Sequence, residues 1–286
     1  MANLKEIRNR IASVSSTMQI TSAMKMVSAA KLKKAQDAIT AMRPYANKLT
    51  ELLQSLSASL DDDSGSKFSA QREVNNVLIV AITSNRGLCG AFNSNIIKEA
   101  NNQAKDVYAN KNVSFVAIGK KANDALKKTS KIVANKSDVY DDLTFDNVAQ
   151  IAEMLMDKFV SGEFDKIELV YNKFKNAATQ EIMTEQFLPI VPVEEHANIK
   201  TDYIFEPSKI EIVEQLIPKS LKTQLYKALR DSFASEHGAR MTAMHKATDN
   251  ATELRDQLKL TYNKARQAAI TNEILEIVGG AEALNN

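Results

Sequence analysis

LKEIRNRIASVSSTMQITSAMKMVSAAKLKKAQDAITAMRPYANKLTELLQSLSASL, residues 4–60, carries a stripe of mostly apolar residues at alternating steps of three and four. Three polar residues, Thr21, Lys25 and Ser28, interrupt it. A heptad pattern held over about eight repeats predicts a long helix that buries one stripe against another helix. The stripe consists of Leu4, Ile7, Ile11, Val14, Met18, Thr21, Lys25, Ser28, Leu32, Ala35, Ile39, Met42, Ala46, Leu49, Leu53, Leu56 and Leu60.

The length of this helix decides what it packs against. A helix over this span extends about 85 Å, which is longer than any core that a chain of this size builds. Much of its stripe must therefore bury against a second long helix. Pro44 removes one backbone hydrogen bond and predicts a bend. An alternative is two ordinary core helices separated at Pro44.

The C-terminal part of the chain supplies the second helix. Residues 209–278 follow the helix start signal Glu206-Pro207-Ser208 and contain one proline, Pro218, and one glycine, Gly238. Small residues in the second stripe allow two helix axes to approach closely. Because both helices join the same inserted segment, we predict that they pair antiparallel. The apolar positions step by four through Val213, Ile217, Leu221, Leu225, Leu229 and Phe233, and by three and four through Met241, Met244, Thr248, Ala251, Arg255, Leu258, Tyr262, Ala265 and Ala269.

The middle of the chain alternates short apolar runs with helical patterns after an acidic, polar linker at residues 61–72. Alternating strands and helices predict a parallel or mixed sheet with helices packed on it. The domain boundaries that follow are 1–60, 73–195 and 208–286. The expected strands are 77–82, 113–118, 167–171 and 181–190, and the expected helices are about 92–108, 120–128 and 145–160.

The turn after the first strand, TSNRGLCG at residues 83–90, is the one candidate for a ligand site. A glycine-containing turn that leads into a helix can bind phosphate on free N–H groups. Gly87 and Gly90 do not complete G-x-G-x-x-G, and the sequence has no G-x-x-x-x-G-K-[ST]. We therefore expect a structural turn made by Arg86, Gly87, Cys89 and Gly90, with nucleotide binding as the alternative.

Composition restricts the class of protein further. The low counts of eight glycines and five prolines favour a protein with long helices. The net charge of +2 gives no global argument that the protein binds nucleic acid. Residues 1–60 alone are basic, with nine Lys or Arg against three Asp or Glu. The lone Cys89 forms no internal disulfide, no secretory leader is present, and the longest apolar run is far short of the roughly 20 residues that span a bilayer. We expect a cytoplasmic chain that meets membranes only through partners.

Four stretches together resemble the gamma subunit family of the bacterial F-type rotary ATP synthase. They are IRNRIASVSSTMQITSAMKMVSAAKLKKAQ (7–36), RGLCG (86–90), SEHGARMTAMHKATDNATEL (235–254) and YNKARQAAITNEILEIVGGAEAL (262–284). The resemblance implies an α/β fold in which both termini form a long antiparallel two-helix coiled coil, with an inserted Rossmann-like α/β domain.

The same resemblance implies a function and a set of partners. It implies a non-catalytic central-stalk rotor that couples proton flow to ATP synthesis or hydrolysis and holds no cofactor. The partners are the alpha and beta subunits of the catalytic hexamer, the epsilon subunit and the c-subunit ring. It further implies a peripheral place on the cytoplasmic face of the bacterial cell membrane, without nucleic acid and without direct membrane insertion.

The resemblance also marks residues. The apolar tip that turns in a sleeve at the top of the hexamer maps onto Ile274, Leu275, Ile277 and Val278. We expect the basic residues of the first helix to meet acidic loops of the hexamer, with a solvated, screened face as the alternative. The candidates for hexamer contact are Arg8, Arg10, Met24, Lys25, Met26, Lys31, Lys33, Lys34, Arg240, Met244, Thr248, Arg266, Gln267 and Thr271.

Some residues depart from the family pattern. Asn85 stands where an acidic residue is common, Gly238 stands where Ala is usual, and His245-Lys246 alters a Lys-Ala pair. A glycine inside a helix costs up to about 1 kcal/mol relative to Ala, which local packing can offset. His196, His237 and His245 lack metal-site spacing, so we expect no bound metal. Two rival classes are a small-ligand α/β module with a helical antenna and a nucleic-acid-binding antenna, and the second lacks interleaved aromatic residues.

Overall fold

We describe the protein from a computed structural model, which describes residues 4–57, 67–190 and 209–285. Two long helices come from the two ends of the chain, α1 (Leu4–Ser57) and α5 (Lys209–Asn285). The chain divides into two compact units. One contains residues 1–28 with 241–286, and the other contains residues 29–240.

The larger unit is built on a five-stranded sheet with the strand order β3-β2-β1-β4-β5. The first four strands in this order are parallel to their neighbours, and β5 is antiparallel to β4. The order 3-2-1-4 is that of dinucleotide-binding folds, in which the order reverses beside the central strand β1. The strands are β1 (Asn76–Ile82), β2 (Asn112–Ile118), β3 (Ile132–Asn135), β4 (Lys166–Phe174) and β5 (Gln180–Leu188).

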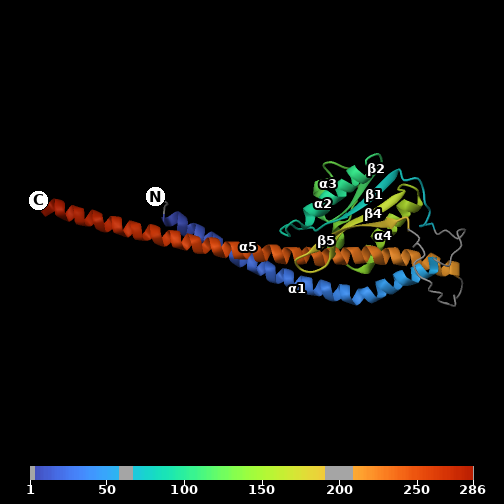
Figure 1. The fold of residues 1–286 in the computed structure, drawn as a ribbon, viewed down its shortest axis with the longest axis horizontal. Coiled ribbons are helices and arrows are strands. Elements are labelled where there is room, and N and C mark those ends of the chain that lie inside the picture. Colours follow the sequence, from blue (N-terminus) through green and yellow to red (C-terminus); the bar gives the residue numbers. More distant parts are fainter. Residues whose placement is uncertain (1–3, 58–66, 191–208, 286) are drawn as a thin grey trace. The chain divides into compact units, whose positions relative to one another are not determined.

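Helices cover both faces of this sheet (Figure 1). In β1, Val77 and Ile79 point into the core beneath α2 (Phe92–Asn102) and α3 (Lys120–Leu126). The alternate residues, such as Leu78, point to the opposite core, which α4 (Phe145–Val160) and the first part of α5 complete. Burial on both faces explains why β1 reads as a continuous apolar run and not as an alternating one.

The smaller unit consists of the first part of α1 and the last part of α5, which lie side by side (Figure 1). Their contacts pair rising numbers in one helix with falling numbers in the other. Lys25 lies beside His245, Thr21 beside Thr248, and Met18 beside Arg255. The two helices of this unit are therefore antiparallel.

Most expected elements are confirmed. The bounds of β1, β2 and β5 lie within two residues of those expected, β4 extends three residues beyond its expected end at 171, and the expected helix 145–160 coincides with α4. The alternative of two helices separated at Pro44 is wrong, because α1 continues through that residue. The expected ends at 58–60, 191–195 and 208, with most of the linker 61–72, lie outside the described residues.

Three elements were not expected. The short strand β3 is only half-buried, so its apolar signal is weak. A 3-10 helix, η3 (Ser137–Tyr140), follows it. The helix expected at 92–108 ends as α2 at Asn102 and continues as a π-helical turn, η2 (Gln103–Val107). No helix in residues 4–57, 67–190 and 209–285 is both long and apolar enough to cross a membrane.

Candidate functional site

The turn that follows β1 is fixed by a network of side chains from its own residues and from α2. The Ser84 backbone N–H donates to Asn93 Oδ1 at 2.9 Å, and Ser84 Oγ donates to the Arg86 carbonyl. Asn93 Nδ2 in turn donates to Ser84 Oγ at 2.9 Å and approaches Cys89 Sγ at 3.2 Å. Leu88 and Gly90 adopt positive φ angles of 61° and 60°. Side chains of the turn and of α2 therefore make hydrogen bonds to backbone groups of the turn, including the Ser84 N–H and the Arg86 carbonyl.

The first residues of η3 and of α3 hold the turn from the other side. Asn85 Nδ2 donates to the Ser137 carbonyl at 2.9 Å, while Asn85 Oδ1 accepts from the Lys120 N–H at 3.0 Å. An amide at this position both donates and accepts, which a carboxylate does not do. The departure at Asn85 thus has a local structural reason. A β-carbon at Gly119 would lie 2.2 Å from the Thr83 carbonyl oxygen, so the end of β2 also requires glycine.

Arg240 of α5 reaches this turn with its guanidinium. Its Nε and Nη2 donate to the carbonyls of Arg86 and Gly87 at 3.3 Å, and its Nη1 lies 2.7 Å from Glu236 Oε1, one turn earlier on the helix. Arg240 is 7% exposed and Glu236 is 8% exposed. The region of the turn that a phosphate would approach instead presents carbonyl oxygens to a buried arginine, which favours the structural turn over a nucleotide site.

Burial and the nearby charges shift the pKa values of the groups around Arg240. Burial raises the pKa of Glu236 above its usual value, while Arg240 and Lys31 act to lower it. His237 is 5% exposed, and burial, together with the charges of Arg240 and Lys31, lowers its pKa to about 4. His237 is therefore neutral near pH 7, so Nδ1 can accept from Arg240 Nη1 at 3.5 Å. Burial also raises the pKa of the Cys89 thiol, which disfavours a nucleophilic thiolate.

Gly238 lies against the turn that joins β4 to β5. A β-carbon built on Gly238 would lie 3.2 Å from both the Cα and the carbonyl oxygen of Ala177. That separation is tighter than an ordinary van der Waals contact between carbon atoms. The glycine thus permits a close approach between α5 and this turn, which the sequence alone did not reveal.

The expected contact residues fall into two groups. Arg240 and Met244 are buried within their own units, and Met24, Lys25 and Thr248 are half-buried. Lys25 Nζ lies 3.3 Å from His245 Nδ1 within the helix pair. Thr248 and Arg240 also bond other parts of the chain, Thr248 to Thr21 and Arg240 to the turn after β1. The exposed members are Arg8, Arg10, Met26, Lys31, Lys33, Lys34, Arg266, Gln267 and Thr271.

The apolar C-terminal segment has no cover within its unit. Every residue from Ile270 to Ala281 is exposed, including Ile274 at 54%, Leu275 at 62%, Ile277 at 71% and Val278 at 52%. A run of exposed large apolar side chains marks a surface for another protein.

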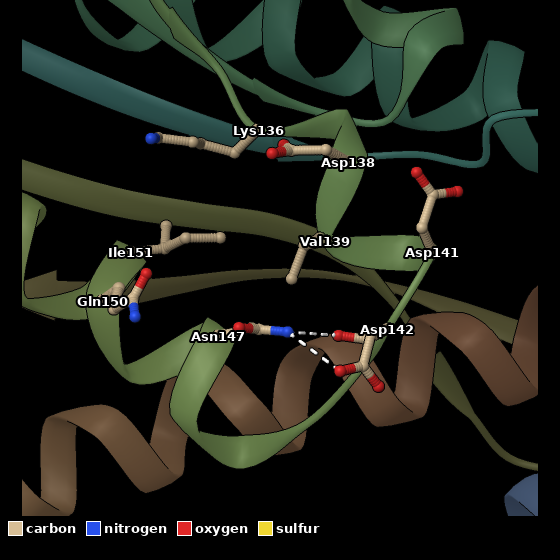
Figure 2. Close-up of a pocket in the computed structure, with 8 residues that line it drawn as sticks. All are labelled: Lys136, Asp138, Val139, Asp141, Asp142, Asn147, Gln150 and Ile151. Atoms are coloured by element: carbon tan, nitrogen blue, oxygen red, sulfur yellow. Dashed lines mark hydrogen bonds between the residues drawn. The ribbon is translucent and has the colours of Figure 1, made fainter.

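A polar pocket of about 220 Å³ opens beside η3 and the start of α4 (Figure 2). Asp138, Asp141 and Asp142 line it with Lys136, and Asn147 Nδ2 donates to the Asp142 carbonyl at 2.9 Å. The acidic lining favours a cationic group. No group of three or more His, Cys, Asp or Glu in the described part of the chain is arranged to hold a metal ion. The pocket adds no catalytic constellation.

These features define a class of α/β protein. A buried arginine on a long C-terminal helix bonds the turn after the central strand, and the two terminal helices pair antiparallel. A sequence profile described as ATP synthase matches residues 3–284. The chain belongs to the gamma-chain family of ATP synthases.

The relatives cover the chain from end to end. An "ATP synthase gamma chain" of Flavobacterium psychrophilum is 77% identical over 99% of both chains. One of Flavobacterium johnsoniae is 74% identical over the full length of both. The fold also matches a rotor chain of the Euglena gracilis mitochondrial ATP synthase, with a TM-score of 0.65 at 22% identity over 93% of this chain and 98% of that one. A chain of the Tetrahymena thermophila central stalk and c-ring matches with a TM-score of 0.58 at 26% identity, over 80% of this chain and 99% of that one.

Proposed function

We infer that the chain is the central-stalk rotor subunit of an F-type ATP synthase, which transmits torque between a proton-driven membrane ring and a catalytic hexamer. The observation that carries this inference is an end-to-end gamma-chain sequence whose termini pair as antiparallel helices in one unit while the residues between them build a sheet domain. The chain has no catalytic role of its own, and it binds no cofactor.

The helix pair works as a coiled coil. Ile7, Thr21 and Ser28 on the α1 stripe and Met244 and Ala251 on the α5 stripe are buried, and other stripe positions such as Met18 and Arg255 are half-buried, which supports this packing. Small residues in the stripes bring the helix axes close together, and knobs-into-holes packing of this kind resists twisting. A stiff pair is what a shaft requires.

Asymmetry makes the shaft able to control catalysis. The two helices differ in length and charge, so the pair presents a different face to each surrounding catalytic subunit. Each catalytic subunit then favours the conformation that fits the face it meets, which shifts its nucleotide affinity by population shift. In this scheme the chain does no chemistry and changes only which conformation of its partners is most stable.

The exposed basic residues are the candidates for hexamer contact that the structure leaves available. Arg8, Arg10, Lys33 and Lys34 are exposed on α1 and face acidic loops of alpha and beta subunits in this proposal. Lys31 has a second role, because its charge acts on Glu236 and His237 within the chain. Met26, Arg266, Gln267 and Thr271 are also exposed. Met24, Lys25 and Thr248 are half-buried and Arg240 and Met244 are buried, so these five candidates offer the hexamer less surface in this proposal.

The apolar C-terminal segment inserts in a sleeve of the hexamer. Its exposed residues Ile274, Leu275, Ile277 and Val278 gain a favourable free energy when they leave water, at about 25 cal/mol for each Å² of apolar surface buried. The sheet domain, in turn, meets the epsilon subunit and the c-subunit ring. The chain is thereby held at the cytoplasmic face of the bacterial membrane as a peripheral subunit.

Reassembly tests the function directly. The full chain is expressed with alpha and beta subunits from the same genome, with and without the epsilon subunit and the membrane sector. We expect a complex that hydrolyses ATP far faster than the isolated chain and that pumps protons once the membrane sector is added. A chain that never joins this complex, or that binds nucleotide stoichiometrically by itself, would contradict the proposal.

A further inference from the structure

The guanidinium of Arg240 bridges two parts of the larger unit. Its Nη1 lies 2.7 Å from Glu236 on α5, and its Nε and Nη2 donate to the carbonyls of Arg86 and Gly87 in the turn after β1. A planar guanidinium offers donors in a fixed fork, so it can satisfy a carboxylate and two carbonyls at once. Arg240 thereby links a long helix to the turn that follows the central strand.

One of the two acceptors in this contact, the Arg86 carbonyl, is also held by other residues of the turn. The Arg86 carbonyl also accepts from Ser84 Oγ, and Asn93 from α2 bonds Ser84 at both its backbone N–H and its hydroxyl. An acceptor that other bonds already fix loses little entropy when it binds a donor. The turn therefore offers Arg240 at least one acceptor whose position is fixed by the turn itself.

Burial makes the contact hard to replace by water. Arg240 and Glu236 are both less than a tenth exposed, and the buried pair is balanced as one cation and one anion. Removing one member of such a pair leaves an uncompensated buried charge. The other groups whose charge or ring faces it include His237, which is neutral, Lys31 of α1 and Arg86 of the turn.

Other polar ties between α5 and the sheet domain lie nearer the surface. Lys222 pairs with Glu153, whose side chain is 52% exposed, and Arg230 Nη2 donates to the Leu143 carbonyl at 2.8 Å from a half-buried position. Neither contacts the turn after β1. Arg240 does, and it is also the last residue of α5 that belongs to the sheet-bearing unit.

We propose that Arg240 is a positioning residue that fastens α5 to the turn after β1 and so stiffens the path along which torque passes between the sheet domain and the terminal helix pair. The proposal rests on the rotor function inferred above. Without this contact, Ile217, Leu221 and Leu229 still hold the first part of α5 in the core of the sheet domain, but the helix near residue 240 yields more under load, and part of the torque is lost.

The first test uses the single natural cysteine as a reporter of the turn. Cys89 is 1% exposed, so its reaction with a thiol reagent measures opening of the turn in the folded full-length chain. We expect Arg240→Ala to raise the reaction rate at least tenfold. Arg230→Ala is the matched control, since it removes another arginine that donates to a carbonyl from the same helix, and it should leave the rate within about twofold of wild type.

The second test measures coupling in the reassembled complex. We expect Arg240→Ala to lower the number of protons pumped per ATP hydrolysed by at least half, while Arg230→Ala leaves this ratio unchanged. Arg240→Lys keeps the charge beside Glu236 but lacks the fork, so it should restore part of both the ratio and the protection of Cys89. If the alanine variant does not assemble, the lysine variant carries the same comparison.

The possible results distinguish a failure of the Arg240 proposal from a failure of the rotor function. Equal effects of Arg240→Ala and Arg230→Ala on the pumping ratio overturn the proposal. So does a faster reaction of Cys89 with an unchanged ratio, because the contact then holds the turn without carrying load. A wild-type complex that hydrolyses ATP but pumps no protons contradicts the rotor function itself, which is a different failure.

Discussion

The hydroxyl oxygens of Thr248 and Thr21 lie 2.8 Å apart, which joins α5 to α1 inside the helix pair. Thr21 is 9% exposed, and it is one of the three polar interruptions in the N-terminal stripe. A buried polar residue in a helix pair costs stability unless it finds a partner, and the partner then fixes the register. The polar residue Thr21 in the α1 stripe therefore has a hydrogen-bond partner, Thr248, on α5.

This pair can be tested with a double-mutant cycle. Thr21→Val or Thr248→Val alone removes one hydroxyl and leaves the other without its cross-helix partner, which should cost about 1 kcal/mol of unfolding free energy. The double variant replaces both by apolar side chains of similar shape, and should cost less than the sum of the single changes. Urea unfolding of the full chain measures all four proteins. Additive costs would show that the two hydroxyls do not interact.

Gly119 is the backbone position least able to accept a side chain. Its φ is 116°, and a β-carbon there would lie 2.2 Å from the Thr83 carbonyl oxygen. We expect Gly119→Ala to lower the unfolding free energy by about 3 kcal/mol or more, because the strained φ and the clash with backbone add. Gly87→Ala is the control, since its β-carbon would meet only the Lys121 Cε at 3.9 Å. Comparable losses in the two variants would contradict this assignment.

His237 predicts a pH dependence of stability. Its pKa falls from 6.5 to about 4 in the folded chain, so between those values the unfolded chain binds the proton more readily. The unfolding free energy should therefore decrease as the pH falls through this window, by about 3 kcal/mol in total from this group. His237→Gln removes the titrating ring, so its stability should change less steeply between pH 7 and pH 4 in chemical unfolding. Parallel curves for the two proteins would rule the effect out.

The basic face of α1 predicts a salt-dependent contact with the hexamer. Lys33 and Lys34 are exposed, and the double variant Lys33→Gln/Lys34→Gln should slow ATP hydrolysis by the reassembled complex several-fold at low salt. The difference should shrink at moderate salt, where the Debye length falls to about 10 Å. The lysines at 127 and 128 on the sheet domain provide a matched control pair. Turnover equal to wild type at both salt concentrations would favour the solvated-face alternative.

The sequence predicted what depends on periodicity. The helices followed from the 3,4 stripe, and β1 followed from a six-residue apolar run that only a doubly covered strand carries. β3 escaped because its four residues are half-buried or exposed and so give little pattern. The sequence did not predict the π-helical turn after α2, because the same amphipathic pattern suits α and π geometry nearly equally.

The candidate site was less predictable, because it depends on contacts between distant residues. The sequence places Arg240 154 positions from Arg86, and nothing in the spacing reveals that one donates to the other's carbonyl. Arg240 and Met244 were predicted to contact the hexamer, and both are buried in the chain itself. A cluster of Glu236, His237 and Arg240 on one stretch of helix is the signal that could have suggested a buried polar contact.

Rotation of the chain itself is the most direct test of the rotor function. Lys128→Cys introduces an exposed thiol on the sheet domain, and the natural Cys89 is buried, so a bead can be attached at the new position alone. With the hexamer fixed to a surface and ATP supplied, we expect the bead to rotate in one direction at a rate that follows hydrolysis. A bead that only fluctuates about a fixed angle while the same complexes hydrolyse ATP would contradict the account.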